Sequence, residues 1–373
     1  MEFEFPEDTL MLRDMLRRFL EKEAKPLEMK YFNAGELEVE ERARLRKAIE
    51  QLGLWGLTVP EEFGGGGLDL LTTCLIEEEL GKTFIPVEIG EVNPLLYASN
   101  EEQITRYLEP TLAGERRAIL AAREPTPNGI NPDEWTTKAE QFDEILELNG
   151  TKLLDSVPAS DDFFIVLAKL DGDSENSGSL SAFIVEMGTS GLEIVTDDQT
   201  LLKLENCKLN RDKILGKPGD PLALSRDDNV RMFVRTGARY VGIGERLIEM
   251  AAEHAKSWVS FEAPLSVRPA INRMLAEMRV DVESSRWLVY YAAWLYDEGK
   301  KELAHATAAQ VRLATGEMLQ RLIDRVTMVF AGPGPSPEIE PHRFVKGLVS
   351  SKAFERVLEQ TRAIVAEEVL KHQ

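Results

Sequence analysis

A run of four glycines, Gly64–Gly67, is the stretch of this sequence whose composition most directly suggests ligand binding. Glycine-rich loops bind phosphate when their backbone N–H groups converge on an oxyanion, and a lysine and a serine or threonine normally follow the glycines. Here Leu68 and Asp69 follow them instead. The sequence therefore predicts a bend in the chain at this point rather than a nucleotide-phosphate site.

Cysteine and histidine are too few and too scattered to suggest a metal site or a nucleophilic triad. The two cysteines, Cys74 and Cys207, lie far apart in the sequence and match no disulfide framework or zinc-ligand spacing. The four histidines are equally dispersed, at positions 254, 305, 342 and 372. We therefore predict two buried or inert thiols and no bound metal.

The charge balance limits the kinds of partner. The 373 residues include 65 acidic and 44 basic residues, and the formal net charge of −21 repels nucleic acid and anionic lipid surfaces. No apolar run approaches the length of about 18 residues that a membrane span needs. Residues 1–20 carry acidic side chains where a secretory signal is basic. We predict a cytoplasmic protein that binds a small molecule or another protein, with no nucleic acid and no membrane span.

The periodicity of apolar residues changes twice along the chain. From Pro6 to about Ala118, apolar residues recur at the three-four spacing of amphipathic helices. From about Ala121 to Leu215, short apolar runs alternate with turn-rich breaks, a pattern typical of strands. Long helical patterns return after Asp220 and favour a four-helix bundle. The predicted fold is α+β and mainly α, with an N-terminal helical domain at 1–118, a middle β domain at 119–219 and a C-terminal four-helix bundle at 220–373.

Two further glycines, Gly242 and Gly244, lie in the phrase VGIGE, inside a helical pattern with no preceding strand. A dinucleotide-binding fingerprint needs a strand directly before its glycines. Close packing of helices is therefore their predicted role.

The segment LGLWGLTVPEEFGGGGLDLL, Leu52 to Leu71, resembles a phrase of the acyl-CoA dehydrogenase family that joins two N-terminal helices. The resemblance covers nearly the whole chain and continues in LNGTK (Leu148 to Lys152), KILGKPG (Lys213 to Gly219), GARYVGIGERLIEMAAEHA and AWLYDEGK. It implies the same order of helical domain, β domain and bundle. It also implies FAD as the cofactor, an acyl-CoA thioester as the substrate and an electron-transfer flavoprotein as the acceptor.

The family's chemistry needs a carboxylate that removes an α-proton of the thioester while the β-hydrogen leaves as hydride to the flavin. In most of the family this base is the glutamate of a YEGT phrase. An alignment from Met328 onward, without a gap, places Glu355 at the position of that glutamate. Phe354 then replaces the tyrosine, and Arg356 and Val357 replace the glycine and the threonine. The alternative is that Glu355 is a solvated charge on an amphipathic helix.

The resemblance also assigns cofactor and substrate contacts. The phrase REPTPNGIN resembles the family's TEPxxGSD, which implies that Arg123 and Pro125 contact the flavin. Ser156 aligns with a threonine that contacts the flavin in the family. Gly332 aligns with a glycine-rich phrase near the adenine of FAD, of which this sequence keeps only part. Arg286 occupies the place of a family arginine near the substrate entrance.

The phrase HAKSWVSFEAPL resembles YAxxRxxFGxPL, whose arginine reaches the pyrophosphate of the flavin bound by the neighbouring subunit. In this alignment Trp258 replaces that arginine, and Glu262 replaces the glycine. Charge-assisted hydrogen bonds contribute roughly 1.5–3 kcal/mol each, so loss of a bidentate pair weakens binding by about two to four decades.

Some family members that act on ring-bearing CoA thioesters consist of two unlike subunits. The resemblance therefore implies one subunit of a heteromeric acyl-CoA dehydrogenase, paired with a related subunit that completes the FAD sites, in the degradation of fatty acids or of steroid and other ring-bearing acids. Two alternatives stay open. The chain is an active homo-oligomer with altered FAD contacts, or it is a catalytically silent relative that binds a CoA ester or only its partner.

Overall fold

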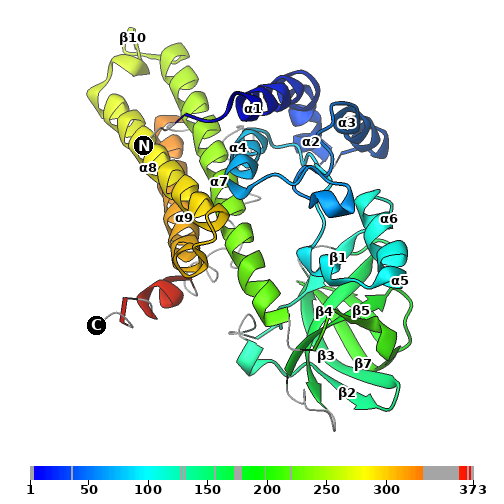
Figure 1. The fold of residues 1–373 in the computed structure, drawn as a ribbon. Helices are drawn as coiled ribbons and strands as arrows, with labels where there is room; N and C mark the ends of the chain where they lie inside the picture. The colour runs from blue at the N-terminus through cyan, green and yellow to red at the C-terminus, as the bar shows by residue number, and fades with distance from the viewer. Residues whose placement is uncertain are drawn as a thin grey trace. The chain divides into compact units, whose positions relative to one another are not determined.

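The computed structural model describes residues 4–34, 37–126, 129, 132–154, 157–171, 179–197, 199–218, 221–330, 361–367 and 369–370. Within these ranges the chain is mainly helical with one large β-sheet, which confirms the predicted α+β class (Figure 1). The chain forms two compact units, one of residues Met1–Ile89 with Asn229–Gln373 and the other of Gly90–Asp228. The division into three domains at 1–118, 119–219 and 220–373 stays a prediction.

The first unit combines helices from both ends of the chain. The N-terminal helices are α1 (Glu7–Phe19), α2 (Glu28–Ala34), α3 (Val39–Gln51) and α4 (Leu70–Gly81), and the C-terminal helices are α7 (Pro221–Ser257), α8 (Pro269–Asp297) and α9 (Lys301–Phe330). Buried side chains such as Val241, Met278 and Leu319 share one core cluster from α7, α8 and α9. Of the fourth predicted bundle helix, residues 361–367 are helical, and residues 331–360 lie outside the described part.

Helix α4 begins where two aspartates satisfy its first backbone N–H groups. Asp69 is the N-cap and accepts a hydrogen bond of 2.7 Å from the Thr72 N–H. Asp297, the last residue of α8, accepts bonds of 2.9 Å from the N–H groups of Leu70 and Leu71. Carboxylates at a helix start satisfy otherwise unpaired donors and complement the helix dipole. The end of α8 therefore fixes the position at which α4 begins.

Helices α4 and α7 cross with their backbones in contact. A Cβ added to Gly242 would lie 2.0 Å from the Glu78 carbonyl oxygen, and one added to Gly81 would lie 2.2 Å from the Arg239 carbonyl oxygen. Only glycine fits at these two positions without moving a helix. For Gly244 the nearest atom is a Val282 methyl group at 2.8 Å. These contacts confirm close helix packing as the role of the glycines in VGIGE.

The glycine run Gly64–Gly67 forms a closed bend between α3 and α4. The backbone N–H groups of Gly64, Gly65, Gly66 and Gly67 donate to carbonyl oxygens of residues 56–61, at 2.9, 3.2, 3.0 and 2.9 Å. Gly64 and Gly67 have φ angles of +82° and +58°, a region that side-chain-bearing residues rarely adopt. Because the chain itself uses all four N–H groups, they are not available to a phosphate, and the predicted bend is confirmed.

The second unit is built on a sheet. Among the described residues, eight strands form one sheet in the order β6-β7-β3-β2-β4-β5-β8, and β1 pairs with β4. The strands are β1 (Ala118–Ala121), β2 (Lys138–Phe142), β3 (Ile145–Leu154), β4 (Phe163–Asp171), β5 (Ser179–Glu186), β6 (Leu192–Thr196), β7 (Thr200–Asn210) and β8 (Ile214–Leu215). Two short helices, α5 (Glu101–Gln103) and α6 (Glu109–Leu112), precede the sheet. The core of this unit includes Phe164, Val166 and Phe183.

Candidate functional site

The residues assigned to FAD are only partly within the described chain. Arg123 pairs with Leu153, whose N–H donates to the Arg123 carbonyl oxygen at 2.7 Å, and Pro125 is exposed in the bend that follows. Ser156, Gly332 and the predicted base Glu355 lie outside the described residues. Their roles, and those of Arg123 and Pro125, stay predictions.

Glu124, between Arg123 and Pro125, holds this bend through its own hydrogen bonds. Its carboxylate accepts bonds from the Thr136 N–H at 3.0 Å and the Thr137 N–H at 2.7 Å, and it faces the Lys152 ammonium at 3.5 Å. Burial by itself raises the pKa of Glu124, but these donors more than offset it and hold the pKa at about 2. The glutamate of the REPTPNGIN phrase is therefore a structural residue.

Lys152, from the LNGTK phrase on β3, is fully buried. Its Nζ lies 3.7 Å from the centre of the Trp135 ring, and burial lowers the pKa of Lys152 to about 8 although Glu124 opposes this shift. The Trp135 N–H donates to the Gly129 carbonyl oxygen at 2.8 Å. The two family phrases are thus joined through one buried ion pair.

In the helical unit, α4 carries three consecutive buried glutamates. Each one binds a different set of basic side chains. Glu77 accepts from Arg235 at 2.6 Å and Arg239 at 2.8 Å. Burial alone would raise the pKa of Glu77, but the two guanidinium groups lower it. Glu77 is therefore a fully paired carboxylate that ties α4 to α7.

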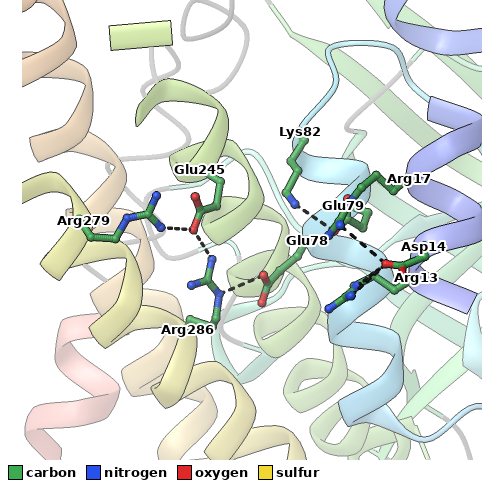
Figure 2. A network of polar contacts seen from close by, with 9 residues as sticks. All are labelled: Arg13, Asp14, Arg17, Glu78, Glu79, Lys82, Glu245, Arg279 and Arg286. Atoms are coloured by element: carbon green, nitrogen blue, oxygen red, sulfur yellow. Dashed lines mark hydrogen bonds and ion pairs between the residues drawn. The ribbon is translucent and has the colours of Figure 1, made fainter. Parts of the chain in front are cut away.

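Glu79 faces the N-terminal helix. It accepts hydrogen bonds of 2.6 and 3.1 Å from Arg17 on α1 and one of 2.9 Å from Lys82 (Figure 2). Arg17 and Lys82 together outweigh the effect of burial and lower the pKa of Glu79. Both oxygens of this carboxylate carry cationic partners, so Glu79 is satisfied within the chain.

Glu78 differs from its neighbours. Its Oε2 accepts a bond of 3.1 Å from Arg286, but its buried Oε1 has no hydrogen-bond partner among the described residues. Burial raises the pKa of Glu78, and Arg286 and the Tyr290 hydroxyl beside it oppose this rise. An unpaired buried acceptor is costly, by roughly 1–3 kcal/mol. Among the three glutamates, Glu78 is therefore the one whose carboxylate is not fully paired by basic side chains of the described residues.

Arg286, the predicted substrate contact, is held by three carboxylates. It donates to Glu78 at 3.1 Å, to Glu245 on α7 at 2.5 Å and to Glu283 at 2.6 Å (Figure 2 shows the first two). Glu245 also accepts a bond of 2.6 Å from Arg279. The guanidinium is committed to the protein, and contact with a substrate stays a prediction.

A cavity of about 350 Å³ lies against this network, within the helical unit. That volume is at the lower end of the range of about 300–1,000 Å³ that is typical of small-molecule sites. The lining comprises Phe5, Arg13, Arg17, Leu75, Glu78, Glu79, Lys82, Glu245, Arg286, Trp287 and Tyr290.

Sequence reasoning did not identify Glu78 or Glu245. One signal was available: three consecutive glutamates in an otherwise apolar helix point in directions about 100° apart and cannot share one solvent face. At least one of them must be buried, and a buried carboxylate needs a partner. The identity of that partner, 208 positions away for Arg286, depends on the tertiary fold.

The segment after α7 presents apolar side chains to solvent. Trp258 is 50% exposed, and the hairpin of β9 (Val259–Ser260) and β10 (Ala263–Pro264) carries Phe261 at its tip, 92% exposed. Phe261 and Glu262 have φ angles of +50° and +63°. Residues 258–264 contain no basic side chain. The position that the family gives to a pyrophosphate-binding arginine therefore carries an exposed aromatic ring.

Within the described ranges, no group of three or more histidine, cysteine, aspartate or glutamate side chains is placed to hold a metal ion. No helix among those residues is both long and apolar enough to cross a membrane.

Comparison with known proteins gives consistent matches. Residues 6–115 match the N-terminal domain model of acyl-CoA dehydrogenases, and residues 231–370 match the C-terminal domain model. A relative, (R)-benzylsuccinyl-CoA dehydrogenase of Thauera aromatica, is 29% identical over 91% of this chain and 89% of its own length. A putative acyl-CoA dehydrogenase structure from Mycobacterium abscessus has a TM-score of 0.85 at 21% identity and covers 100% of both chains. An acyl-CoA dehydrogenase from Bacillus anthracis, solved with FAD, has a TM-score of 0.82 at 25% identity and covers 99% of this chain and 69% of its own.

Proposed function

Because this chain belongs to the acyl-CoA dehydrogenase family of flavin oxidoreductases, we propose that it takes part in the α,β-desaturation of an acyl-CoA thioester, with FAD as the hydride acceptor. The observation that carries this proposal is the family match at both ends of the chain, together with the shared order of helices, sheet and helices. FAD, when bound, supplies the acceptor for the hydride. An electron-transfer flavoprotein is the acceptor that we propose for the reduced cofactor.

The residues near the family's FAD positions fit the cofactor only in part. The bend at Arg123–Pro125 keeps a defined shape through the buried Glu124 and Lys152 pair, which supports a flavin-binding surface on the sheet unit. The segment after α7 does not fit, because residues 258–264 offer a dianionic pyrophosphate no positive charge and place Glu262 there. Opposite charges are needed to hold a pyrophosphate strongly.

We therefore propose that a related subunit supplies the missing cation, so that this chain works as part of a heteromer. The exposed Trp258, Val259 and Phe261, at 50, 62 and 92% exposure, support this proposal because exposed apolar patches mark contact surfaces. The name of the Thauera relative refers to a ring-bearing thioester, which favours ring-bearing acyl groups among the substrates. An active homo-oligomer with altered FAD contacts and a catalytically silent relative are the alternatives.

Purification with and without the related subunit tests the heteromer. We expect the chain alone to be colourless and the co-expressed complex to carry FAD, measured by visible absorbance and by FAD released per chain. A stoichiometric yellow homo-oligomer would overturn the proposal. In a homo-oligomer of this chain, where each copy would donate to its neighbour's cofactor, the double variant Trp258→Arg/Glu262→Gly should strengthen FAD binding by about two to four decades. The matched control Trp258→Ala/Glu262→Gly removes the same groups without adding a cation and should gain far less.

We propose Glu355 as the base, on the sequence match. Glu355→Gln should lower kcat by about 100-fold or more, because general base catalysis contributes roughly 10²–10⁴-fold. Glu359→Gln, one helical turn further along the predicted helix, is the matched control and should leave kcat unchanged. Equal activity of the two variants would instead support a silent or surface role for Glu355.

A further inference from the structure

One side of α8 presents large apolar side chains to solvent. Trp287, Tyr291 and Trp294 are 48, 49 and 40% exposed, and Val280, two turns before Trp287, is 64% exposed. Residues three, four and seven positions apart lie on the same side of a helix, so these side chains follow one line along α8 (Figure 1). An aromatic side chain buries about 150–250 Å² when it is fully covered, so three half-exposed rings leave roughly 200–400 Å² uncovered. Exposed apolar patches of that size mark contact sites.

This line continues to both ends of α8 with a spacing that reads the same in either direction. The α8 stripe consists of the exposed residues Arg273, Glu277, Val280, Ser284, Trp287, Tyr291, Trp294 and Glu298, the last of which directly follows the helix. Their numbers rise alternately by four and by three, beginning and ending with four. The mean step is close to the helical repeat of about 3.6 residues, so the stripe runs nearly straight along the helix. A second α8 in the opposite direction would therefore match the stripe position by position, around a twofold axis between Ser284 and Trp287.

In that register the half of the stripe with smaller side chains meets the aromatic half. Ser284 would face Trp287 of the second copy, and Val280 would face Tyr291, because the members of each pair lie equally far from the axis. The twofold axis repeats both contacts. Large side chains opposite small ones let two packed helices interdigitate. The centre of the stripe is thus complementary in shape to itself.

The charges at the ends of the stripe are complementary as well. Arg273, whose side chain is 74% exposed, would face Glu298 of the second copy. Glu277 would face Trp294, and the Lys300 Nζ lies 3.9 Å from the centre of that ring, so a carboxylate would come near an ammonium. Parallel packing would instead oppose Arg273 to its own copy, and opposed like charges disfavour an interface. The charges therefore favour antiparallel pairing.

We propose that the α8 stripe binds a second copy of this chain, antiparallel and around a twofold axis between Ser284 and Trp287. A twofold interface uses the same patch on both copies, which must be complementary to itself, and the α8 stripe meets this requirement. Its alternating three-four spacing gives a crossing angle of about 20°. The inference does not depend on the proposed activity. The segment after α7 is not part of the stripe, so one copy can also bind the related subunit there.

Sedimentation equilibrium of the full chain, alone and in complex with the related subunit, tests the contact. We expect the chain to self-associate, and Tyr291→Lys, which places a charge within the stripe, should weaken the association by at least about 30-fold, as expected for a central interface residue. Met11→Lys on α1 is the matched control, because Met11 is 63% exposed and lies outside the stripe. Circular dichroism shows whether each variant is folded. Absence of self-association in both preparations, or association that Tyr291→Lys leaves unchanged, would overturn the proposal.

Cysteine cross-linking tests the register. In the proposed pairing, position 273 of one copy faces position 298 of the other, whereas the two 273 positions lie about 37 Å apart along the helix axis. A mixture of Arg273→Cys and Glu298→Cys chains, one of them tagged and both treated with a short bifunctional maleimide, should therefore join unlike variants and not like ones. The native thiols Cys74 and Cys207 are buried and should not interfere. Cross-links between like variants, or cross-links only to the related subunit, would overturn the proposal.

A charge exchange provides a test that does not alter the aromatic centre. Arg273→Glu should weaken self-association by about 10-fold, because two exposed ion pairs become repulsive. The double variant Arg273→Glu/Glu298→Arg should restore it, since opposite charges again face each other. A double variant as weak as the single one would overturn the pairing. FAD content, measured on the same samples, decides the heteromer proposal separately, because a colourless dimer of this chain supports the stripe and leaves the missing cation to the related subunit.

Discussion

Replacement of Lys152 by methionine gives a pH-dependent change in stability whose size follows from the structure. Lys152 is buried against the Trp135 ring and the Glu124 carboxylate, and burial lowers its pKa from 10.5 to about 8. The unfolded chain therefore binds more protons than the folded chain between about pH 8 and 10.5, so the contribution of Lys152 to stability rises with pH across that range. Methionine has a similar length and no titrating group.

Between pH 7 and pH 10, the free energy of unfolding of the native protein should rise by about 2.5 kcal/mol relative to that of Lys152→Met. This size follows from the shift in pKa, because one pKa unit corresponds to about 1.36 kcal/mol. Urea unfolding followed by circular dichroism and tryptophan fluorescence measures this difference at each pH. Lys138→Met is the matched control, because Lys138 lies half-exposed on the adjacent strand and Glu140 raises rather than lowers its pKa.

A difference that stays flat from pH 7 to 10 would show that Lys152 keeps an ordinary pKa and would refute the reasoning. The same result for Lys138→Met as for Lys152→Met would refute it equally. Glu124→Gln should be destabilising by about 3–5 kcal/mol at pH 7, because it leaves the buried ammonium without its counter-charge. In the double variant with Lys152→Met this cost should be smaller, and a purely additive cost would rule out coupling between the two groups.

Three further predictions concern the helix crossing, the hairpin after α7 and the two thiols. Gly242→Ala should destabilise the protein by more than about 3 kcal/mol in urea unfolding, because the added Cβ would lie only 2.0 Å from a backbone oxygen. Gly244→Ala should destabilise it less, because its Cβ would lie 2.8 Å from a side-chain methyl group that can move. Equal losses of stability would refute backbone contact at the helix crossing. Glu262→Gly should raise the free energy of unfolding, measured by thermal unfolding, by about 1 kcal/mol, because glycine adopts the left-handed backbone conformation of residue 262 without strain. A lower free energy of unfolding would show that this conformation is not strained. Cys74 and Cys207 should not react with iodoacetamide until the protein unfolds, because both thiols are buried. Burial also raises the pKa of both thiols, to about 11 for Cys207. Rapid alkylation of the folded protein at pH 8 would contradict their burial.

The sequence was sufficient for features that depend on local patterns. The change from three-four spacing to short apolar runs located the sheet, and the residues after Gly67 ruled out a phosphate loop. Their isolation in the sequence predicted that Cys74 and Cys207 are buried or inert, and the structure confirms their burial.

Features that depend on distant partners were not predictable in this way. Nothing local shows that Glu78 meets Arg286, or that Arg286 is shared among three carboxylates. The pairing of Glu124 with Lys152 is similar, since the sequence suggested both phrases but not that they close one buried ion pair. The predicted roles of Ser156, Gly332 and Glu355 rest on the sequence match alone, because these residues lie outside the described part of the chain.

The joint origin of the helical unit has a consequence for synthesis on the ribosome. When α4 emerges, Arg17 is already available to Glu79, but the arginines that pair with Glu77 and Glu78 do not yet exist, and Arg286 follows Glu78 by 208 residues. At translation speeds of about 5–20 residues per second, this delay is roughly 10–40 seconds. During that interval the N-terminal helices can pack on one another, but Glu77 and Glu78 lack their partners on α7 and α8. Nascent chains should therefore be most open to chaperones at this stage, and a fragment that ends at residue 89 should be unable to pair Glu77 and Glu78.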